Sequence, residues 1–288
     1  MTAVALRSQL NPPIPVLSQI RSRLDRQSES AALDAQVLLA HITGKPRAWV
    51  LAHPEQTLTK EETESLEAAL AHLEQGTPLP YVLGHWEFYG LDFWVTSATL
   101  IPRPETELLV ERALEWLLLQ PKRRLAVDVG TGTGCIAVAL AAHIPDLYLL
   151  ACDISPQALR VAQKNVHRHG VQARVSCLQA DLLPPAMKPV DLICANLPYI
   201  PSATLKSLDV ARWEPGLALD GGPDGLDLVR RLLFAAPAAL APGGRMLLEI
   251  EATQGAAALE LARLAFPQAE AALIQDLASR DRLICIQT

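Results

Sequence analysis

The stretch LAVDVGTGTG, residues 125–134, decides the fold of this chain. Apolar residues typical of a buried strand lead into three glycines at alternate positions, Gly130, Gly132 and Gly134. Because glycine has no side chain, the backbone there can turn sharply and approach a ligand closely. A helical pattern follows over 135–143. This strand, glycine loop and helix predict one unit of a parallel α/β sheet.

Helices and short apolar strands alternate on both sides of this unit. We predict helices over 105–119, 156–169 and 226–240, and strands over 147–152, 173–178, 190–195 and 245–250. Two further strands, over 271–274 and 283–286, suit a C-terminal antiparallel hairpin. Alternation of this kind predicts a Rossmann-like, mostly parallel sheet covered on both faces. Ligands of such sheets bind where the strands end at their carboxyl side.

The residues before this region have a different pattern. Apolar residues recur at helical spacing between positions 14 and 76, and Thr59 with Glu62 forms a capping-box pattern. Aromatic and β-branched residues flank Tyr89-Gly90, which predicts a β-hairpin. We therefore expect a small helical domain over 1–79, a hairpin linker over 80–100 and the α/β domain over 101–288. The helical domain is assigned to substrate recognition, with simple scaffolding as the alternative.

The composition indicates a folded protein with well-filled cores, since 50% of the 288 residues are hydrophobic and 19% are charged. The net charge is −6, and neither half carries the basic surplus typical of nucleic-acid binders. No apolar run approaches the roughly 20 residues of a membrane span, and the N-terminus lacks a signal-peptide pattern. We expect a cytoplasmic monomer with no nucleic-acid or membrane partner.

The five cysteines are odd in number and show no CxxC spacing. We interpret them as reduced core thiols of a cytoplasmic protein, and we expect no metal site. Cys135, directly after the glycines, has two interpretations. It is a reactive thiol or, as we favour, a small residue that packs the start of a helix.

Asp153 ends the strand that follows the glycine loop, where its carboxylate can accept hydrogen bonds from two ribose hydroxyls. A dinucleotide site requires glycine at position 135, and the Walker A lysine is absent. S-adenosylmethionine fits better, because it has a ribose and an adenine but no phosphate. The predicted contacts are Gly130, Thr131, Gly132, Thr133 and Gly134 for its amino-acid end, Asp153 for its ribose, and the Asp181-Leu182 turn for its adenine. A plain helix cap is the alternative role of Asp181.

Asn196-Leu197-Pro198-Tyr199 follows the predicted strand over 190–195 directly. A carboxamide and a neighbouring backbone carbonyl offer two acceptors to the hydrogens of a planar NH2 group, and the tyrosine ring can cover its flat face. An amide nitrogen is a poor nucleophile because its lone pair is delocalised. Accepting both hydrogens raises its electron density and aims it at the methyl group, so catalysis is mostly positioning and electrostatics, and we assign no general base. Asn196 is expected to border the cofactor as well.

Five segments together resemble the N5-glutamine methyltransferases that modify peptide-chain release factors. They are IPRPETE at 101–107, the glycine loop at 130–134, NLPY at 196–199, WEP at 213–215 and DGGPDG at 220–225. The resemblance spans nearly the whole chain. It implies methyl transfer from S-adenosylmethionine, with S-adenosylhomocysteine as product, to the glutamine amide in the Gly-Gly-Gln loop of release factors, a step that serves translation termination.

The resemblance also implies the roles of the acceptor residues. In the family the Asn side chain and the following backbone carbonyl hold the amide, which correspond here to Asn196 and Leu197, with Pro198 and Tyr199 completing the substrate-binding and catalytic set. This chain has Leu197 where the family has its first proline. The carbonyl is retained, but the fixed φ of proline is lost.

Three alternatives stay open at this point. The acceptor motif also serves glutamine methyltransferases of ribosomal proteins, although the 102–107 run favours the release-factor branch. Methyltransferases of exocyclic amines in nucleic acids use similar motifs, and the acidic balance argues against them. A noncatalytic module that binds the cofactor as a signal is the third. The sequence leaves open which release factors are accepted.

Overall fold

The computed structural model describes residues 15–288 except 27, 29 and 186. The chain forms two compact units, with the boundary between Leu83 and Gly84. The predicted hairpin therefore belongs to the second unit. Residues 1–14 of the predicted helical domain lie outside the described residues.

The first unit is helical, as the apolar spacing predicts. Its helices are α1 (Val16–Leu24), α2 (Ala31–Thr43), α3 (Arg47–Ala52), α4 (Lys60–Glu74) and α5 (Leu79–Leu83). The capping box at α4 is confirmed, because the Thr59 hydroxyl accepts from the Glu62 N–H at 3.1 Å and the Glu62 carboxylate accepts from the Thr59 N–H at 2.7 Å. The short helices α3 and α5 were not predicted, since five or six residues carry too little periodicity.

The second unit is built on a seven-stranded sheet in the order β5-β4-β3-β6-β7-β9-β8. The strands are β3 (Leu125–Val129), β4 (Tyr148–Asp153), β5 (Val175–Gln179), β6 (Val190–Ala195), β7 (Leu240–Glu249), β8 (Glu270–Gln275) and β9 (Asp281–Gln287). Strands β3 to β7 pair in parallel, and β9 lies antiparallel between β7 and β8. The predicted mostly parallel sheet with an antiparallel C-terminal hairpin is confirmed.

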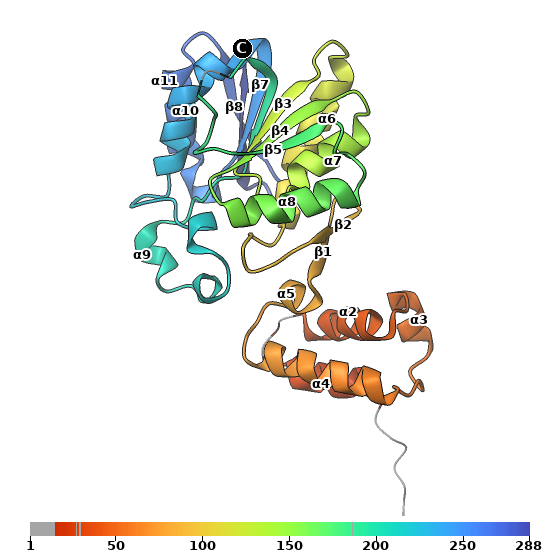
Figure 1. The fold of residues 1–288 in the computed structure, drawn as a ribbon. Helices are drawn as coiled ribbons and strands as arrows, with labels where there is room; N and C mark the ends of the chain where they lie inside the picture. Colours follow the sequence, from red (N-terminus) through yellow and green to blue (C-terminus); the bar gives the residue numbers. More distant parts are fainter. Residues whose placement is uncertain (1–14, 27, 29, 186) are drawn as a thin grey trace, which may run out of the picture. The chain divides into compact units, whose positions relative to one another are not determined.

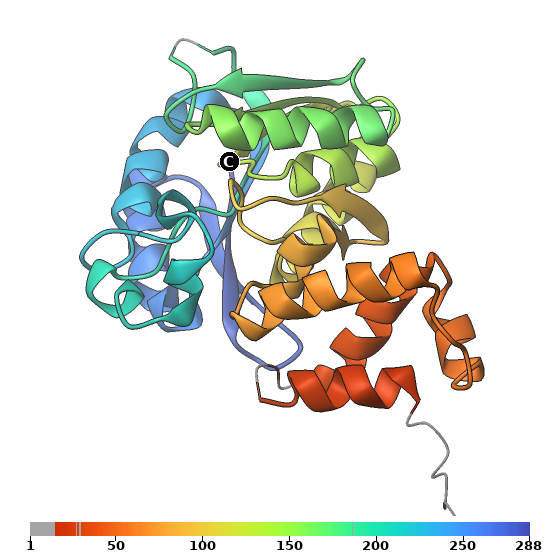
Figure 2. The same ribbon diagram turned by 60° about the horizontal axis from the view of Figure 1, so that its bottom comes forward.

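Helices cover both faces of this sheet (Figures 1 and 2). Three of them lie on one face, α6 (Glu107–Leu119), α7 (Cys135–His143) and α8 (Pro156–Arg168), and two on the other, α10 (Asp227–Ala239) and α11 (Gly255–Ala265). The short helix α9 (Ser202–Leu205) and three 3-10 turns, η1 (Pro104–Thr106), η2 (Asp209–Arg212) and η3 (Gly216–Ala218), border the loops at the carboxyl ends, and η4 (Ala252–Gln254) precedes α11. Helix α11 was not predicted because glycine and alanines form its buried face, which weakens the apolar periodicity.

A β-hairpin packs against α8 within the second unit. Its strands, β1 (His85–Phe88) and β2 (Leu91–Trp94), meet at Tyr89 and Gly90, both with positive φ, as a tight two-residue turn requires. The buried Asn165 of α8 accepts from the Trp94 N–H at 2.7 Å, and it donates to the carbonyls of Trp94 at 3.0 Å and Thr133 at 2.8 Å. One carboxamide thus connects the hairpin to the glycine loop.

Neither a membrane span nor a cluster of metal ligands occurs in the part of the chain that the structure describes. Across 15–288, the gaps at 27, 29 and 186 aside, no helix is long and apolar enough to cross a bilayer. Over the same described positions, the His, Cys, Asp and Glu side chains form no group of three or more that could hold a metal ion. The cysteines are free thiols. Burial raises the pKa of Cys135 to about 12, so this thiol stays protonated and packs the start of α7.

Candidate active site

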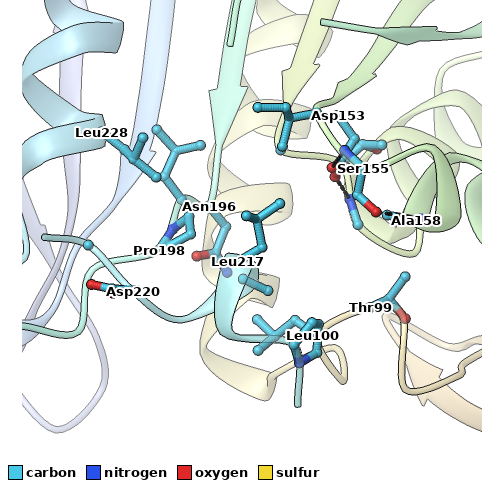
Figure 3. Close-up of a pocket in the computed structure, with 18 of the residues that line it drawn as sticks. Thr99, Leu100, Asp153, Ser155, Ala158, Asn196, Pro198, Leu217, Asp220 and Leu228 are labelled. Atoms are coloured by element: carbon cyan, nitrogen blue, oxygen red, sulfur yellow. Dashed lines mark hydrogen bonds between the residues drawn. The ribbon is translucent and has the colours of Figure 1, made fainter. Parts of the chain in front are cut away.

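A cavity of about 660 Å³ opens at the carboxyl ends of the parallel strands. Its walls come from the glycine loop, the end of β4, the turn after β5, the residues after β6 and the segments 98–106 and 215–222. Figure 3 shows Asn196 and Pro198 on one side of the cavity and Asp153 and Ser155 on the other. The volume is within the range of small-molecule sites. The structure therefore brings the two sequence motifs, 130–134 and 196–199, into one site.

Each glycine of the loop is required for a different reason. All three have positive φ. A Cβ on Gly134 would lie 3.3 Å from the Cα of Ala162, so the missing side chain allows α7 and α8 to approach. A Cβ on Gly130 would lie 3.0 Å from the Leu197 side chain, whereas one on Gly132 would meet nothing closer than 4.0 Å. Gly132 thus leaves open space on the cavity side of the loop.

Asp128 of β3 holds the glycine loop and the start of α7 through hydrogen bonds. Its Oδ2 accepts from the Thr131 hydroxyl at 2.6 Å and from the Ala137 N–H at 3.2 Å. Its Oδ1 is buried without a partner in the part of the chain that the structure describes. Burial raises the pKa of Asp128 to about 7. The sequence interpretation treated this residue only as part of a strand.

Asp153 faces the cavity from the end of β4, as the sequence predicts for a ribose-binding acid. Its Oδ2 accepts from the Gly132 N–H and its Oδ1 from the Ser155 N–H, each at 2.9 Å. Burial raises the pKa of this carboxyl group, although these backbone hydrogen bonds oppose the shift. Each carboxylate oxygen keeps a further lone pair for a ligand hydroxyl.

The Asp181-Leu182 turn also lines the cavity. Leu182 has a φ of 63°, and the Asp181 carboxylate accepts from Arg231 of α10 at 2.7 Å. No helix starts at Asp181 among the described residues, so the helix-cap interpretation does not apply. One wall of the cavity is formed by this turn after β5 together with Leu228 and Arg231 of α10.

Asn196 presents its carboxamide at the opposite wall. Its Nδ2 donates to the hydroxyl of Thr106 at 2.9 Å, and its Oδ1, the accepting end of the group, has no hydrogen-bond partner among the described residues. The buried Leu197 side chain packs on Gly130. This packing contact joins the turn after β6 to the glycine loop. Within the described residues, the Leu197 carbonyl accepts no hydrogen bond from the protein.

Tyr199 is the one member of the predicted acceptor set that does not line the cavity. Its carbonyl accepts from Gln254 Nε2 at 2.9 Å, which anchors the turn. Burial raises the pKa of its hydroxyl, beside Glu249 of β7. Sequence reasoning missed Glu249, although it ends a parallel strand at the edge where ligands bind. It also left Thr106 unassigned within the quoted 101–107 run.

An ion pair joins two segments that form the rim of the cavity. The buried Glu214 carboxylate pairs with Arg103 and accepts from the Ile101 N–H at 3.0 Å. This single side chain therefore ties the loop 198–225 to the segment before α6. The contact connects two of the segments that carry the family resemblance, 101–107 and 213–215.

Replacing Glu214 with alanine should lower the free energy of unfolding by about 2 kcal/mol, because it leaves a partly buried guanidinium and a backbone N–H without their acceptor. Urea denaturation measures the change. Glu115→Ala removes an exposed pair with Arg112 and should change stability by less than about 1 kcal/mol. Equal effects of the two substitutions would show that the Glu214 contacts add nothing to an ordinary surface pair.

Two features define the class of protein. One is the sheet order, with an antiparallel strand inserted beside the last parallel strand, and the other is the glycine loop followed by a strand that ends in an acidic residue. The second unit is an S-adenosylmethionine-dependent methyltransferase domain of Rossmann-like fold.

Comparison with known proteins identifies the family within this class. Residues 105–212 match the family model described as Methyltransferase small domain, and residues 16–84 match the PrmC N-terminal domain. The chain is 45% identical over 258 residues to the release factor glutamine methyltransferase of Moorella thermoacetica, covering 88% of this chain and 90% of that protein. This chain belongs to the release factor glutamine methyltransferase family.

Another relative agrees with this placement, and one solved structure shares the fold. The enzyme of the same name from Xylella fastidiosa is 41% identical, with 94% of this chain and 96% of that protein covered. The hMettl16 catalytic domain, solved in complex with the MAT2A 3′UTR hairpin 6, superposes with a TM-score of 0.54 at 17% identity, covering 78% of this chain and 81% of that one. That likeness shows a shared fold.

Proposed function

We propose that this protein transfers a methyl group from S-adenosylmethionine to the side-chain amide N5 of the glutamine in the Gly-Gly-Gln loop of peptide-chain release factors. One observation carries the proposal. The Asn196 carboxamide, with its oxygen free, shares a cavity with the glycine loop and Asp153. The names of the relatives, which are 37–45% identical over most of the chain, support the same reaction.

The residues of the cavity fit S-adenosylmethionine. Gly132 leaves space beside the loop, and Asp153 offers two carboxylate oxygens for hydroxyl groups. The loop 130–134 would hold the amino-acid end, Asp153 the ribose, and the Asp181-Leu182 turn the adenine. When bound, the cofactor supplies an activated methyl group and leaves as S-adenosylhomocysteine.

The chain's own residues hold and activate the acceptor. Asn196 Oδ1 and the Leu197 carbonyl accept the two hydrogens of the glutamine NH2 group, which fixes the nitrogen and raises its electron density. The proton becomes acidic only as the nitrogen gains positive charge, so no dedicated base is assigned. Pro198 borders the same wall of the cavity. The predicted stacking of the Tyr199 ring on the amide stays a prediction.

The substrate is proposed to dock with help from the helical domain, assigned to 1–79. We place the protein in the cytoplasm as a monomer, with release factors as its partners and with no nucleic-acid or membrane partner. The net charge of −6 supports a protein substrate over an exocyclic amine of a nucleic acid.

Labelled S-adenosylmethionine tests this assignment directly. The protein is incubated with a release factor, with the same factor carrying Gln→Ala in its Gly-Gly-Gln loop, with ribosomal proteins and with total RNA. Label should enter only the release factor that keeps its glutamine. Label on the Gln→Ala factor, on a ribosomal protein or on RNA in place of the release factor would overturn the proposal.

Asp153→Asn should weaken cofactor binding by about 10- to 100-fold, since it replaces one of the two accepting oxygens with a donating NH2 group and removes the negative charge. The backbone N–H groups of Gly132 and Ser155 would also lose their charged acceptor. Isothermal titration calorimetry with S-adenosylhomocysteine measures the change. Asp209→Asn, the same substitution at an exposed position outside the cavity, serves as control. Equal affinities of the two variants would remove Asp153 from the cofactor site.

A further inference from the structure

The orientation of the Asn196 carboxamide depends on Thr106. Thr106 ends η1 and is 2% exposed, and its hydroxyl accepts from Asn196 Nδ2 at 2.9 Å. A carboxamide has one donating end and one accepting end. Because Thr106 engages the donating end, the accepting end is the one that remains for a ligand in the cavity. Without this contact, a rotation of about 180° would place the NH2 group there instead, at little cost.

Thr106 can accept in this way only if its own hydrogen is directed elsewhere, because a hydroxyl carries one hydrogen. Glu249 lies at the end of β7, beside Asn196, because the register of the sheet pairs Ala195 of β6 with Leu248 of β7. It is 2% exposed, the Thr106 and Tyr199 hydroxyls lower the pKa of its carboxyl group, and its Oε2 has no partner within the described residues. Glu249, Thr106 and Asn196 therefore lie near one another behind the acceptor wall.

We propose that Thr106, backed by Glu249, is a positioning residue that holds Asn196 with its carboxamide oxygen toward the acceptor nitrogen. The inference rests on the proposed function, because it assigns a role in the same reaction. An ionised carboxylate is acceptor-only, so it draws the Thr106 hydrogen away from Asn196. Its negative charge, behind Thr106 and Asn196, also favours the positive charge that develops on the nitrogen.

The protonation of Glu249 gives this arrangement a pH dependence. The pKa of Glu249 is raised to about 7, mainly by burial and also by Glu105, while the Thr106 and Tyr199 hydroxyls and Arg282 oppose the rise. Cys135 also interacts with this carboxylate. The ionised form exists above this pKa, so turnover should decline as the pH is lowered through about 7. Asp128 titrates in the same range, so the profile of the unaltered protein alone does not assign the group.

Two substitutions at Thr106 test the positioning role. Thr106→Val removes the hydroxyl and should lower kcat by about 10- to 100-fold, because the Asn196 NH2 group loses its partner and the carboxamide loses its orientation. Thr106→Ser keeps the hydroxyl and should stay within about threefold of the unaltered kcat. Affinity for S-adenosylhomocysteine and the melting temperature are measured for both. A kcat of Thr106→Val equal to that of Thr106→Ser, or an equal loss of cofactor affinity, would overturn the inference.

Glu249→Gln tests the same line of contacts without touching the cavity wall. We expect a lower kcat at pH 8 and loss of the decline below pH 7 that the unaltered enzyme shows. A decline that persists unchanged in Glu249→Gln would overturn the part assigned to Glu249. These outcomes are separate from the proposed function, which fails only if the unaltered enzyme does not methylate release factors.

Discussion

Asn196→Ala is expected to lower the turnover number by about 1,000-fold, near the upper end of what one preorganised hydrogen-bonding group contributes to catalysis. The substitution removes the acceptor oxygen that orients the glutamine NH2 group. Asp153, on the other side of the cavity, is untouched (Figure 3). Affinity for S-adenosylmethionine should therefore stay within a few fold, as calorimetry and single-turnover labelling of a release factor will measure.

Asp153→Asn is the matched counterpart, because it should mainly lower cofactor affinity. The two variants together test whether the cavity has one wall for the acceptor and one for the cofactor. If Asn196→Ala loses cofactor affinity and turnover to the same extent, this division of labour is wrong.

Gly225→Ala is expected to lower the free energy of unfolding by about 3 kcal/mol or more, since it combines a strained φ with a steric clash. Gly225 has a φ of +79°, and a Cβ there would lie 2.2 Å from the Tyr199 carbonyl oxygen and 2.4 Å from Gln254 Nε2. That carbonyl belongs to the turn that carries Asn196, so turnover should fall as well. Urea denaturation and methyl transfer at a permissive temperature measure the two effects.

Gly216→Ala is the control for this prediction. Gly216 lies in the same loop, its φ is not in the left-handed region, and a Cβ there would meet nothing within 4 Å. It should therefore change stability by less than about 1 kcal/mol. A similar loss of stability in both variants would mean that the loop tolerates neither change for reasons other than the contact with Tyr199.

Local patterns in the sequence determined the elements that carry the site. The strands over 125–129 and 190–195 and the helix over 135–143 coincide with β3, β6 and α7. The apolar runs of the two strands end abruptly at Gly130 and Asn196, and that of the helix begins at Cys135, so the apolar pattern and the residues that bound it agree. The same runs placed the glycine loop and Asn196 at strand ends. The family resemblance supplied the reaction and the substrate.

Other elements could not be predicted from the sequence because they depend on packing. The alanine face of α11 gives little periodicity, and the insertion of β9 between β7 and β8 depends on which edges pair. Strand order is a property of the assembled sheet, since a run of apolar residues specifies burial but not its neighbour. The same holds for Leu197, whose side chain supports the turn only because Gly130 lies against it.

The tertiary structure alone decided which polar groups meet behind the acceptor wall. Thr106 and Asn196 are 90 positions apart and Glu214 and Arg103 are 111 apart, yet each pair is in hydrogen-bond contact. Periodicity reports whether a side chain faces water or the core, and it contains no information on the partner of a buried polar group. That partner is set by strand order and register, which place the ends of β6 and β7, and with them Asn196 and Glu249, next to each other.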